Sequence, residues 1–160
     1  MGRDDYAPPM PTQAEEIIIP ALLRAARGAY GNAVRERLAA AGFDDMPKNG
    51  PFVLGGVANR GFAPADVIRE LRVSKQAASQ LIDTLVLRGY LERTPDPDDR
   101  RRLTLEVTAR GREAAKAVRE GVEAVDQALA ARISADEMHG LIVGLHALAE
   151  IRGDHAGPEE

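Results

Sequence analysis

Between residues 64 and 107 the spacing of the apolar residues changes from a helical repeat to a two-residue alternation, and this change limits the folds open to the chain. Apolar side chains recur every three or four positions within residues 63–72 and again within residues 75–88. Residues 103–107, Leu-Thr-Leu-Glu-Val, then alternate apolar and polar side chains, as a strand with one buried face does. The pattern predicts two short helices followed by a β-hairpin.

The ends of these elements carry residues typical of caps and turns. Ser74 precedes the second helix, where its hydroxyl can accept a hydrogen bond from a free backbone N–H of the first turn. Gly89 follows that helix and can adopt the left-handed conformation that ends many helices. Residues 90–94 are the expected partner strand, and the polar segment 95–102 is too long for a tight two-residue turn. With a short turn around Val73, these elements compose a winged helix-turn-helix.

Further helices are expected before this region. An apolar stripe over residues 19–38 predicts a first helix that starts near Pro20 and ends near Gly42. A short helix is expected over residues 52–57, and Gly61 closes it. The stripe on the first helix is wider than a small winged helix needs.

Two helices are also expected after the hairpin. Thr108 can cap a long helix that continues to about residue 131, and Ser134 can cap a last helix with apolar residues from Met138 to Ile151. The sequence therefore predicts a mainly α fold with a small β-hairpin wing, in which terminal dimerisation helices accompany the winged helix-turn-helix. Wide apolar stripes are typical of a surface that another chain covers; the alternative is that both pack within their own chain.

Composition and missing motifs exclude several classes of function. At 160 residues the chain has the length of one domain, and its lack of cysteine removes disulfides, thiolate nucleophiles and cysteine-based zinc sites. No nucleotide-binding, zinc-protease or serine-hydrolase motif is present, so we expect no enzymatic activity, no cofactor and no metal site. No apolar run approaches the ~20 residues of a membrane-spanning helix, and the first ten residues lack the order of a signal peptide. A cytoplasmic location without membrane contact is expected.

The charge is distributed unevenly along the chain. The formal net charge is −4, but residues 69–112 contain 10 basic against 7 acidic side chains, while the segments on both sides are net acidic. A local excess of positive charge attracts nucleic-acid phosphates whatever the total charge is. Because the cationic segment coincides with the predicted helix-turn-helix and wing, double-stranded DNA is the expected partner.

The exposed end of the second helix carries side chains suited to DNA. A recognition helix needs small or polar residues where it enters the major groove. Gln can form two hydrogen bonds with adenine, Lys can reach guanine or a phosphate, and the free N–H groups at the helix start can bind a phosphate. The residues of this helix predicted to contact DNA are Ser74, Lys75, Gln76, Ala77, Ser79 and Gln80.

The hairpin loop contains three consecutive arginines, Arg100, Arg101 and Arg102, after two aspartates. An arginine at a wing tip can enter the minor groove, where A·T-rich DNA has an enhanced negative potential. A neighbouring aspartate, Asp98 or Asp99, can fix its direction through a charge-assisted hydrogen bond. The alternative is a polar turn whose charges cancel.

Residues 71–111 resemble the DNA-binding core of the MarR (multiple antibiotic resistance regulator) family. The stretch VSKQAASQLIDTL is similar to the family's recognition helix, RGYLERTPDPDDRR to its first wing strand and tip, and LTLEVTARG to the return strand and the next helix start. The family's wing signature is an Asp, one residue and then an Arg. Asp99 and Arg101 match it, which implies that Asp99 braces Arg101 in the minor groove. Without cysteine, the chain cannot be one of the family's thiol-oxidation sensors.

The resemblance implies a sequence-specific transcriptional regulator, a ligand-responsive homodimeric repressor that binds an inverted-repeat operator. Within a single domain over residues 1–160, residues 14–42 and 109–153 would be dimerisation helices and residues 43–108 the winged helix region. The two recognition helices would lie one DNA turn apart, ~34–36 Å. The alternative from another class is a winged helix that binds protein partners. Such a helix would be apolar or acidic at its exposed end, where this chain has Lys, Gln and Ser.

A small effector is also implied, because family members commonly bind phenolic or other aromatic anions between the dimer region and the winged helix. The candidates to line such a cleft are Tyr30, Phe43, Phe52 and Phe62, although each of these residue types is more often found in an ordinary core. His139 and His146 share one face of the last predicted helix, but the pattern does not complete a clear metal site.

Overall fold

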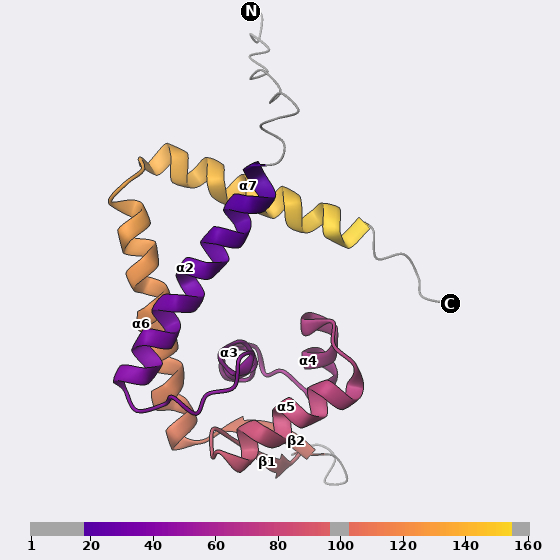
Figure 1. Ribbon diagram of the computed structural model, residues 1–160. Coiled ribbons are helices and arrows are strands. Elements are labelled where there is room, and N and C mark those ends of the chain that lie inside the picture. The colour runs from indigo at the N-terminus through magenta and orange to yellow at the C-terminus, as the bar shows by residue number, and fades with distance from the viewer. Residues whose placement is uncertain (1–17, 97–102, 155–160) are drawn as a thin grey trace, which may run out of the picture.

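Six helices and one β-hairpin make up the described part of the chain, which is residues 18–96 and 103–154 of a computed structural model (Figure 1). In chain order the elements are α2 (Ile18–Ala40), α3 (Gly50–Arg60), α4 (Pro64–Leu71), α5 (Lys75–Leu87), β1 (Leu91–Pro95), β2 (Leu103–Val107), α6 (Ala109–Ala130) and α7 (Ala135–Asp154). Every helix and strand expected in these ranges is present, so the mainly α fold with a hairpin wing is confirmed. No helix within these ranges is long and apolar enough to cross a lipid bilayer.

Helices α2 and α6 lie side by side in opposite directions and form the long arm of the molecule (Figure 1). They approach closely at Gly121, where α6 has no side chain. A Cβ atom added at Gly121 would lie only 2.8 Å from the Cα atom of Val34, so the two backbones meet there. Further along the contact, the hydroxyl of Tyr30 donates a hydrogen bond of 2.5 Å to Asp126. The buried small residues of α6 are Gly111, Ala114, Ala117 and Gly121.

Helices α3, α4 and α5 and the hairpin pack around one apolar core. Proline is the first residue of α4, where its missing N–H is not needed. Asp66 stabilises the same turn by accepting a 2.8 Å hydrogen bond from the backbone N–H of Ala63. The largest side chains of the core are fully buried, namely Val53, Leu54, Val67, Ile82, Leu85, Tyr90 and Leu91.

The hairpin is the wing that the sequence predicts. Strands β1 and β2 pair antiparallel from Leu91 opposite Val107 to Pro95 opposite Leu103. Leu91 and Leu105 face the core, whereas the hydroxyls of Thr94 and Thr104 lie 3.0 Å apart on the other side of the pair. The wing therefore has one face fixed on the protein core and one polar face.

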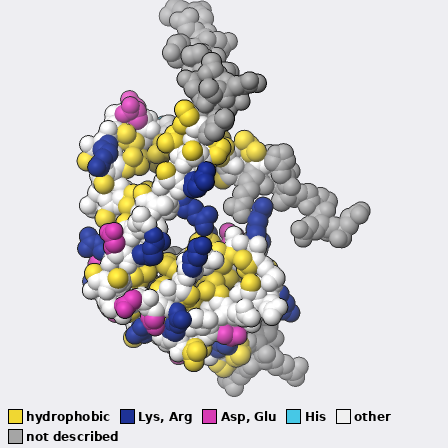
Figure 2. All heavy atoms as spheres, in the orientation of Figure 1, with side chains coloured by type: hydrophobic (Ala, Val, Ile, Leu, Met, Phe, Trp, Pro, Cys, Tyr) yellow, Lys and Arg dark blue, Asp and Glu magenta, His cyan; other side chains and the backbone are white. Residues whose placement is uncertain are grey.

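Helix α7 stands apart from the rest of the described chain. None of its residues from Ala135 to Ile151 is buried, and it makes no extensive contact with another described element. Figure 2 shows hydrophobic side chains exposed over the region of α7 and the N-terminal end of α2. Only the C-terminal half of the stripe on α2, with Val34 and Leu38, is buried within the chain. The large apolar residues left exposed on these two helices are Ile18, Ile19, Leu22, Leu23, Leu141, Ile142, Val143, Leu145, Leu148 and Ile151.

Candidate nucleic-acid interface

The N-terminal half of α5 presents a polar surface to solvent. Its opposite side, with Ala78, Ile82 and Leu85, is buried in the core, and this burial fixes which side chains point outward. The six residues at and within the start of this helix that are predicted to contact DNA are all exposed, namely Ser74, Lys75, Gln76, Ala77, Ser79 and Gln80. The helix thus has the geometry that docking into a major groove requires.

The start of α5 is capped and carries no negative side chain. The hydroxyl of Ser74 accepts a 3.2 Å hydrogen bond from the backbone N–H of Ala77, as the sequence predicts. The remaining N–H groups of a first helical turn have no partner inside the helix and carry partial positive charge. Because the first turn of α5 contains no acidic residue, an anion can approach these groups without repulsion.

An ion pair joins α5 to the wing. Arg93 on β1 donates to Asp83 on α5 at 2.5 Å, although neither residue is among the sequence candidates. A shallow groove of about 300 Å³ lies between α4, α5 and β1, and Lys75, Ser79 and Arg93 are among its lining residues. The proposed wing contacts, Arg100, Arg101 and Arg102 with Asp98 and Asp99, lie outside the described residues.

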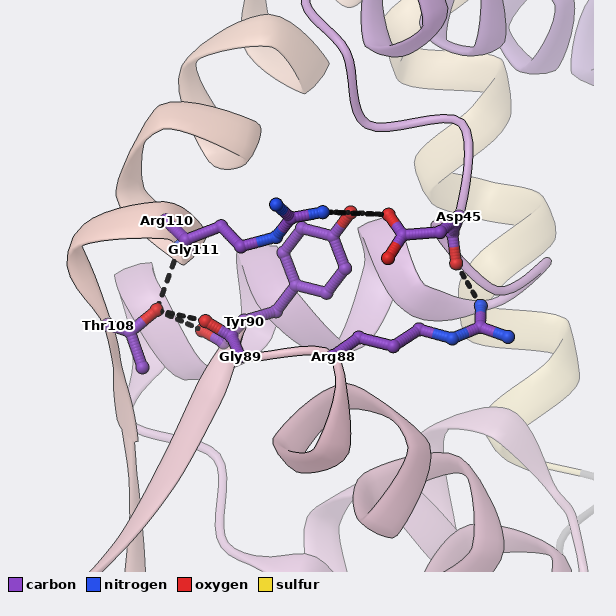
Figure 3. A network of polar contacts seen from close by, with 7 residues as sticks. All are labelled: Asp45, Arg88, Gly89, Tyr90, Thr108, Arg110 and Gly111. Atoms are coloured by element: carbon purple, nitrogen blue, oxygen red, sulfur yellow. Dashed lines mark hydrogen bonds and ion pairs between the residues drawn. The ribbon is translucent and has the colours of Figure 1, made fainter.

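A second polar cluster lies behind α5, at its C-terminal end (Figure 3). Here Asp45, from the loop between α2 and α3, meets three residues from later segments. Its carboxylate accepts hydrogen bonds from the hydroxyl of Tyr90 and, at 3.0 Å, from Arg110. Its backbone carbonyl accepts a hydrogen bond from Arg88. We call Asp45, Arg88, Tyr90 and Arg110 the Asp45 anchor.

The protonation states within the Asp45 anchor follow from these contacts. The hydrogen bond from Tyr90, assisted by the charge of Arg110, holds the pKa of the Asp45 carboxyl below its ordinary value. Burial, together with the hydrogen bond to Asp45, raises the pKa of the Tyr90 phenol. Hydrogen bonding to Tyr90 raises the pKa of the Arg110 guanidinium. Near neutral pH the anchor therefore combines a carboxylate, a guanidinium and a protonated phenol.

Thr108 connects the start of α6 to the same region. Its hydroxyl accepts a 2.9 Å hydrogen bond from the N–H of Gly111, which caps α6 as the sequence predicts. The hydroxyl also lies 2.5 Å from the carbonyl oxygen of Gly89, to which it donates. A Cβ atom at Gly111 would lie 2.1 Å from the carbonyl oxygen of Tyr90, so only glycine permits this close approach.

The four aromatic residues predicted to line an effector cleft do not gather in one place. Tyr30 bonds to Asp126 within the long arm, and Phe43 packs edge-on against Tyr90 at a ring distance of 6.1 Å. Phe52 and Phe62 form a separate tilted pair at 6.0 Å. A hollow of about 230 Å³ instead lies between α3 and α6, lined by Gly55, Ala58, Asn59, Ala115, Val118, Arg119 and Val122.

The two candidate metal ligands, His139 and His146, both lie on the exposed helix α7. In the part of the chain that the structure describes, no three His, Asp or Glu side chains gather in a group that could bind a metal ion.

Comparison with known proteins shows which family and which solved structures the chain resembles. Residues 52–102 match the sequence model of the MarR family. The chain is 26% identical to RV1404 from Mycobacterium tuberculosis, with 95% of this chain and 100% of that one aligned at a TM-score of 0.65. It is 23% identical to a mutant of MarR from E. coli crystallised in complex with operator DNA, covering 86% of this chain and 99% of that one at a TM-score of 0.66.

The transcriptional regulator Tm0710 from Thermotoga maritima is also similar, at 23% identity and a TM-score of 0.55, over 92% of this chain and 100% of that one. A search of curated proteins found no significant match. The family match covers α4, the recognition helix α5 and β1 and ends before β2, and the fold agreement extends over the flanking helices. Residues 52–102 are therefore similar to the MarR family, and the chain as a whole has the fold of these solved structures.

Proposed function

We propose that this protein is a homodimeric, sequence-specific DNA-binding regulator that represses transcription from an inverted-repeat operator. The observation that carries the proposal is the exposed polar half of α5 with its capped, acid-free start. A winged helix that binds protein partners would present apolar or acidic residues there. The operator DNA in the crystallised E. coli MarR mutant supports DNA as the ligand of this fold.

The proposed contacts fall into two sets. Gln76 and Gln80 face base edges in the major groove, while Ser74, Lys75 and the free N–H groups at the start of α5 bind phosphates. Arg101, braced by Asp99, enters the adjacent minor groove. Phosphate contacts supply affinity that is independent of sequence, whereas the glutamines supply specificity.

The proposed dimer uses the two terminal regions of the chain. Its support is the large exposed apolar surface of α7 and of the N-terminal half of α2, which no other described element covers. A second copy that covers this surface would place the two α5 helices on the same DNA duplex, one turn apart.

The glutamines provide the direct test. Operator fragments are first selected from random DNA with the wild-type protein, and each variant is then titrated against operator and random DNA. We expect Gln76→Ala and Gln80→Ala to lose ~1–3 kcal/mol of operator binding each, with little change toward random DNA. The matched control is Gln127→Ala, an exposed glutamine on α6 far from the proposed interface in sequence. Unchanged operator preference in both α5 variants would contradict the proposed orientation.

We further propose that the effector is a small aromatic anion that binds in the hollow between α3 and α6. The support is its apolar lining, from Ala58, Val118 and Val122, beside the amide of Asn59 and the guanidinium of Arg119. A benzoate should release wild-type protein from its operator. Arg119→Gln should bind the operator normally but require roughly tenfold more benzoate, because one charge-assisted hydrogen bond is lost. An identical benzoate response in this variant would place the effector elsewhere.

A further inference from the structure

The recognition helix has no extensive direct contact with the long arm, but residues that follow its C-terminal end bond to residues connected to that arm. Among the described elements α5 makes extensive contacts with α3, α4 and β1, but not with α2 or α6. Arg88 and Tyr90 follow α5 directly, and the N–H of Tyr90 donates a 2.9 Å hydrogen bond to the carbonyl of Leu85. These two residues therefore move with the helix.

Asp45, the partner of Arg88 and Tyr90, is connected to the long arm by backbone hydrogen bonding of its loop. Asp45 lies in a loop whose Phe43 N–H donates a 2.8 Å hydrogen bond to the carbonyl of Leu38, at the C-terminal end of α2. Arg110, in the first turn of α6, completes the connection. Its guanidinium lies 4.8 Å from the centre of the Tyr90 ring and 5.4 Å from that of Phe43. The Asp45 anchor thus fastens one end of α5 to both helices of the arm (Figure 3).

The anchor residues differ in how much of each side chain is exposed, and this difference distinguishes residues that pack in the core from residues that position α5. The ring of Tyr90 is fully buried and belongs to the core, but the side chains of Asp45 and Arg110 remain 45% and 43% exposed. Exposed ion pairs contribute little to the free energy of folding. These contacts instead fix the orientation of the loop relative to the end of α5, because Asp45 is bonded through both its carboxylate and its backbone carbonyl.

We propose that Asp45 is a positioning residue for DNA recognition: through Arg88, Tyr90 and Arg110 it sets the angle of α5 against the α2–α6 arm. This inference rests on the proposed function. In the proposed dimer, whose interface includes the N-terminal half of α2, that angle fixes the distance between the two recognition helices. The operator spacing that the protein selects is then determined in part by a loop that does not face the DNA.

The test compares Asp45→Asn and Tyr90→Phe with Asp44→Asn. Tyr90→Phe keeps the buried ring and removes only the hydroxyl. Asp44→Asn makes the same charge change one residue away, and Asp44 has no hydrogen bond or ion pair within the described ranges. Each full-length variant is titrated against the selected operator, operators with the half-sites one base pair closer or farther apart, and random DNA. Thermal unfolding is followed in parallel.

We expect both anchor variants to bind the operator about tenfold more weakly, because each subunit loses a hydrogen bond to a charged group. Their preference among half-site spacings should flatten, their affinity for random DNA should stay within about twofold, and Asp44→Asn should match the wild type. The double variant should be weakened by less than the sum of the two single effects, since both changes act on the contact between Asp45 and Tyr90.

A wild-type spacing profile and operator-to-random ratio in Asp45→Asn and Tyr90→Phe would overturn the inference, even if their thermal midpoints fall. The proposed function would then stand, because the wild-type protein would still select an operator. If the wild-type protein itself shows no preference among DNA sequences, the proposed function fails and this inference fails with it.

Discussion

At the scale of single residues, the contact of α2 with α6 depends on the absence of a side chain. The atoms nearest to a Cβ atom placed on Gly121 are the Cα atom of Val34 at 2.8 Å and the carbonyl oxygen of Ala33 at 3.0 Å. These are backbone atoms, so they cannot turn aside as the end of a flexible side chain could. The helices would have to separate to admit even one methyl group.

We therefore expect Gly121→Ala to lower the free energy of unfolding by ~1–3 kcal/mol, although alanine is the better helix former. The control is Gly28→Ala on α2, where a Cβ atom would meet nothing within 4 Å. This change should raise stability by up to ~1 kcal/mol through helix propensity alone. Urea unfolding of both variants measures the two effects, and a stabilised Gly121→Ala would contradict the backbone contact.

Caps could be predicted from single residues, whereas the Asp45 anchor could not. Ser74 and Thr108 bond to N–H groups three residues ahead, so their role follows from residue type and position in the chain. Asp45 meets Tyr90 and Arg110 only after the chain has folded, across 45 and 65 residues of sequence. No local pattern indicates such a pair. The same reason explains why Asp83 and Arg93 were not among the candidates.

At the scale of elements, the wing combines a fixed base with a tip that carries the charge. The base is held by the buried Leu91 and Leu105 and by the ion pair between Arg93 and Asp83. The predicted minor-groove residue, Arg101, lies outside the described residues. The bracing hypothesis requires that the affinity gained when Asp99 orients this arginine exceeds the affinity lost through repulsion between Asp99 and the DNA phosphates.

Two substitutions at the wing tip separate these effects. Arg101→Ala should weaken DNA binding and reduce its salt dependence by about one counterion per site. Asp99→Ala should also weaken binding, because an arginine without its brace must be ordered again on every encounter. The double variant should be non-additive, since the first change already breaks the pair. All three variants are titrated against one operator at fixed salt.

Simple electrostatics predicts the opposite sign for the aspartate. If Asp99→Ala binds DNA more tightly, or if the two changes add independently, Asp99 is only a turn residue and the bracing hypothesis is wrong.

The elements themselves were largely predictable because their periodicity and end residues are local. The short helix expected over residues 52–57 extends further in the structure, from Gly50 to Arg60, although glycines at 55 and 56 weaken its helix propensity. At Gly56, tertiary packing explains why a residue of low helix propensity occupies the helix. A Cβ atom there would lie 2.2 Å from the ring of Phe62, so this glycine is required by a tertiary contact.

At the scale of the whole molecule, the unpaired apolar surface predicts an obligate dimer. Sedimentation at micromolar concentration should give twice the chain mass of 17.2 kDa. Leu145→Asp, on α7, should shift the protein toward monomer, because a charge would be buried at the interface. Leu87→Asp is the control, since Leu87 is an apolar residue on α5 that is 87% exposed and lies outside the proposed interface.

A stable monomer of the wild-type protein would contradict the dimer, and so would equal effects of the two substitutions. The second outcome would mean that α7 is no more sensitive to charge than an ordinary exposed position.

Because α7 is not covered by its own chain, the stability of the protein should depend on its concentration. In the proposed dimer, the apolar residues of α7 leave water only when a second molecule arrives, so part of the folding free energy obeys mass action. Tenfold dilution of such a dimer removes about 1.4 kcal/mol of stability. The thermal midpoint should fall with it. A cell that makes few copies of this chain would accordingly hold a larger share of them unfolded and open to proteolysis. The rate at which the protein is degraded would therefore rise as its concentration falls.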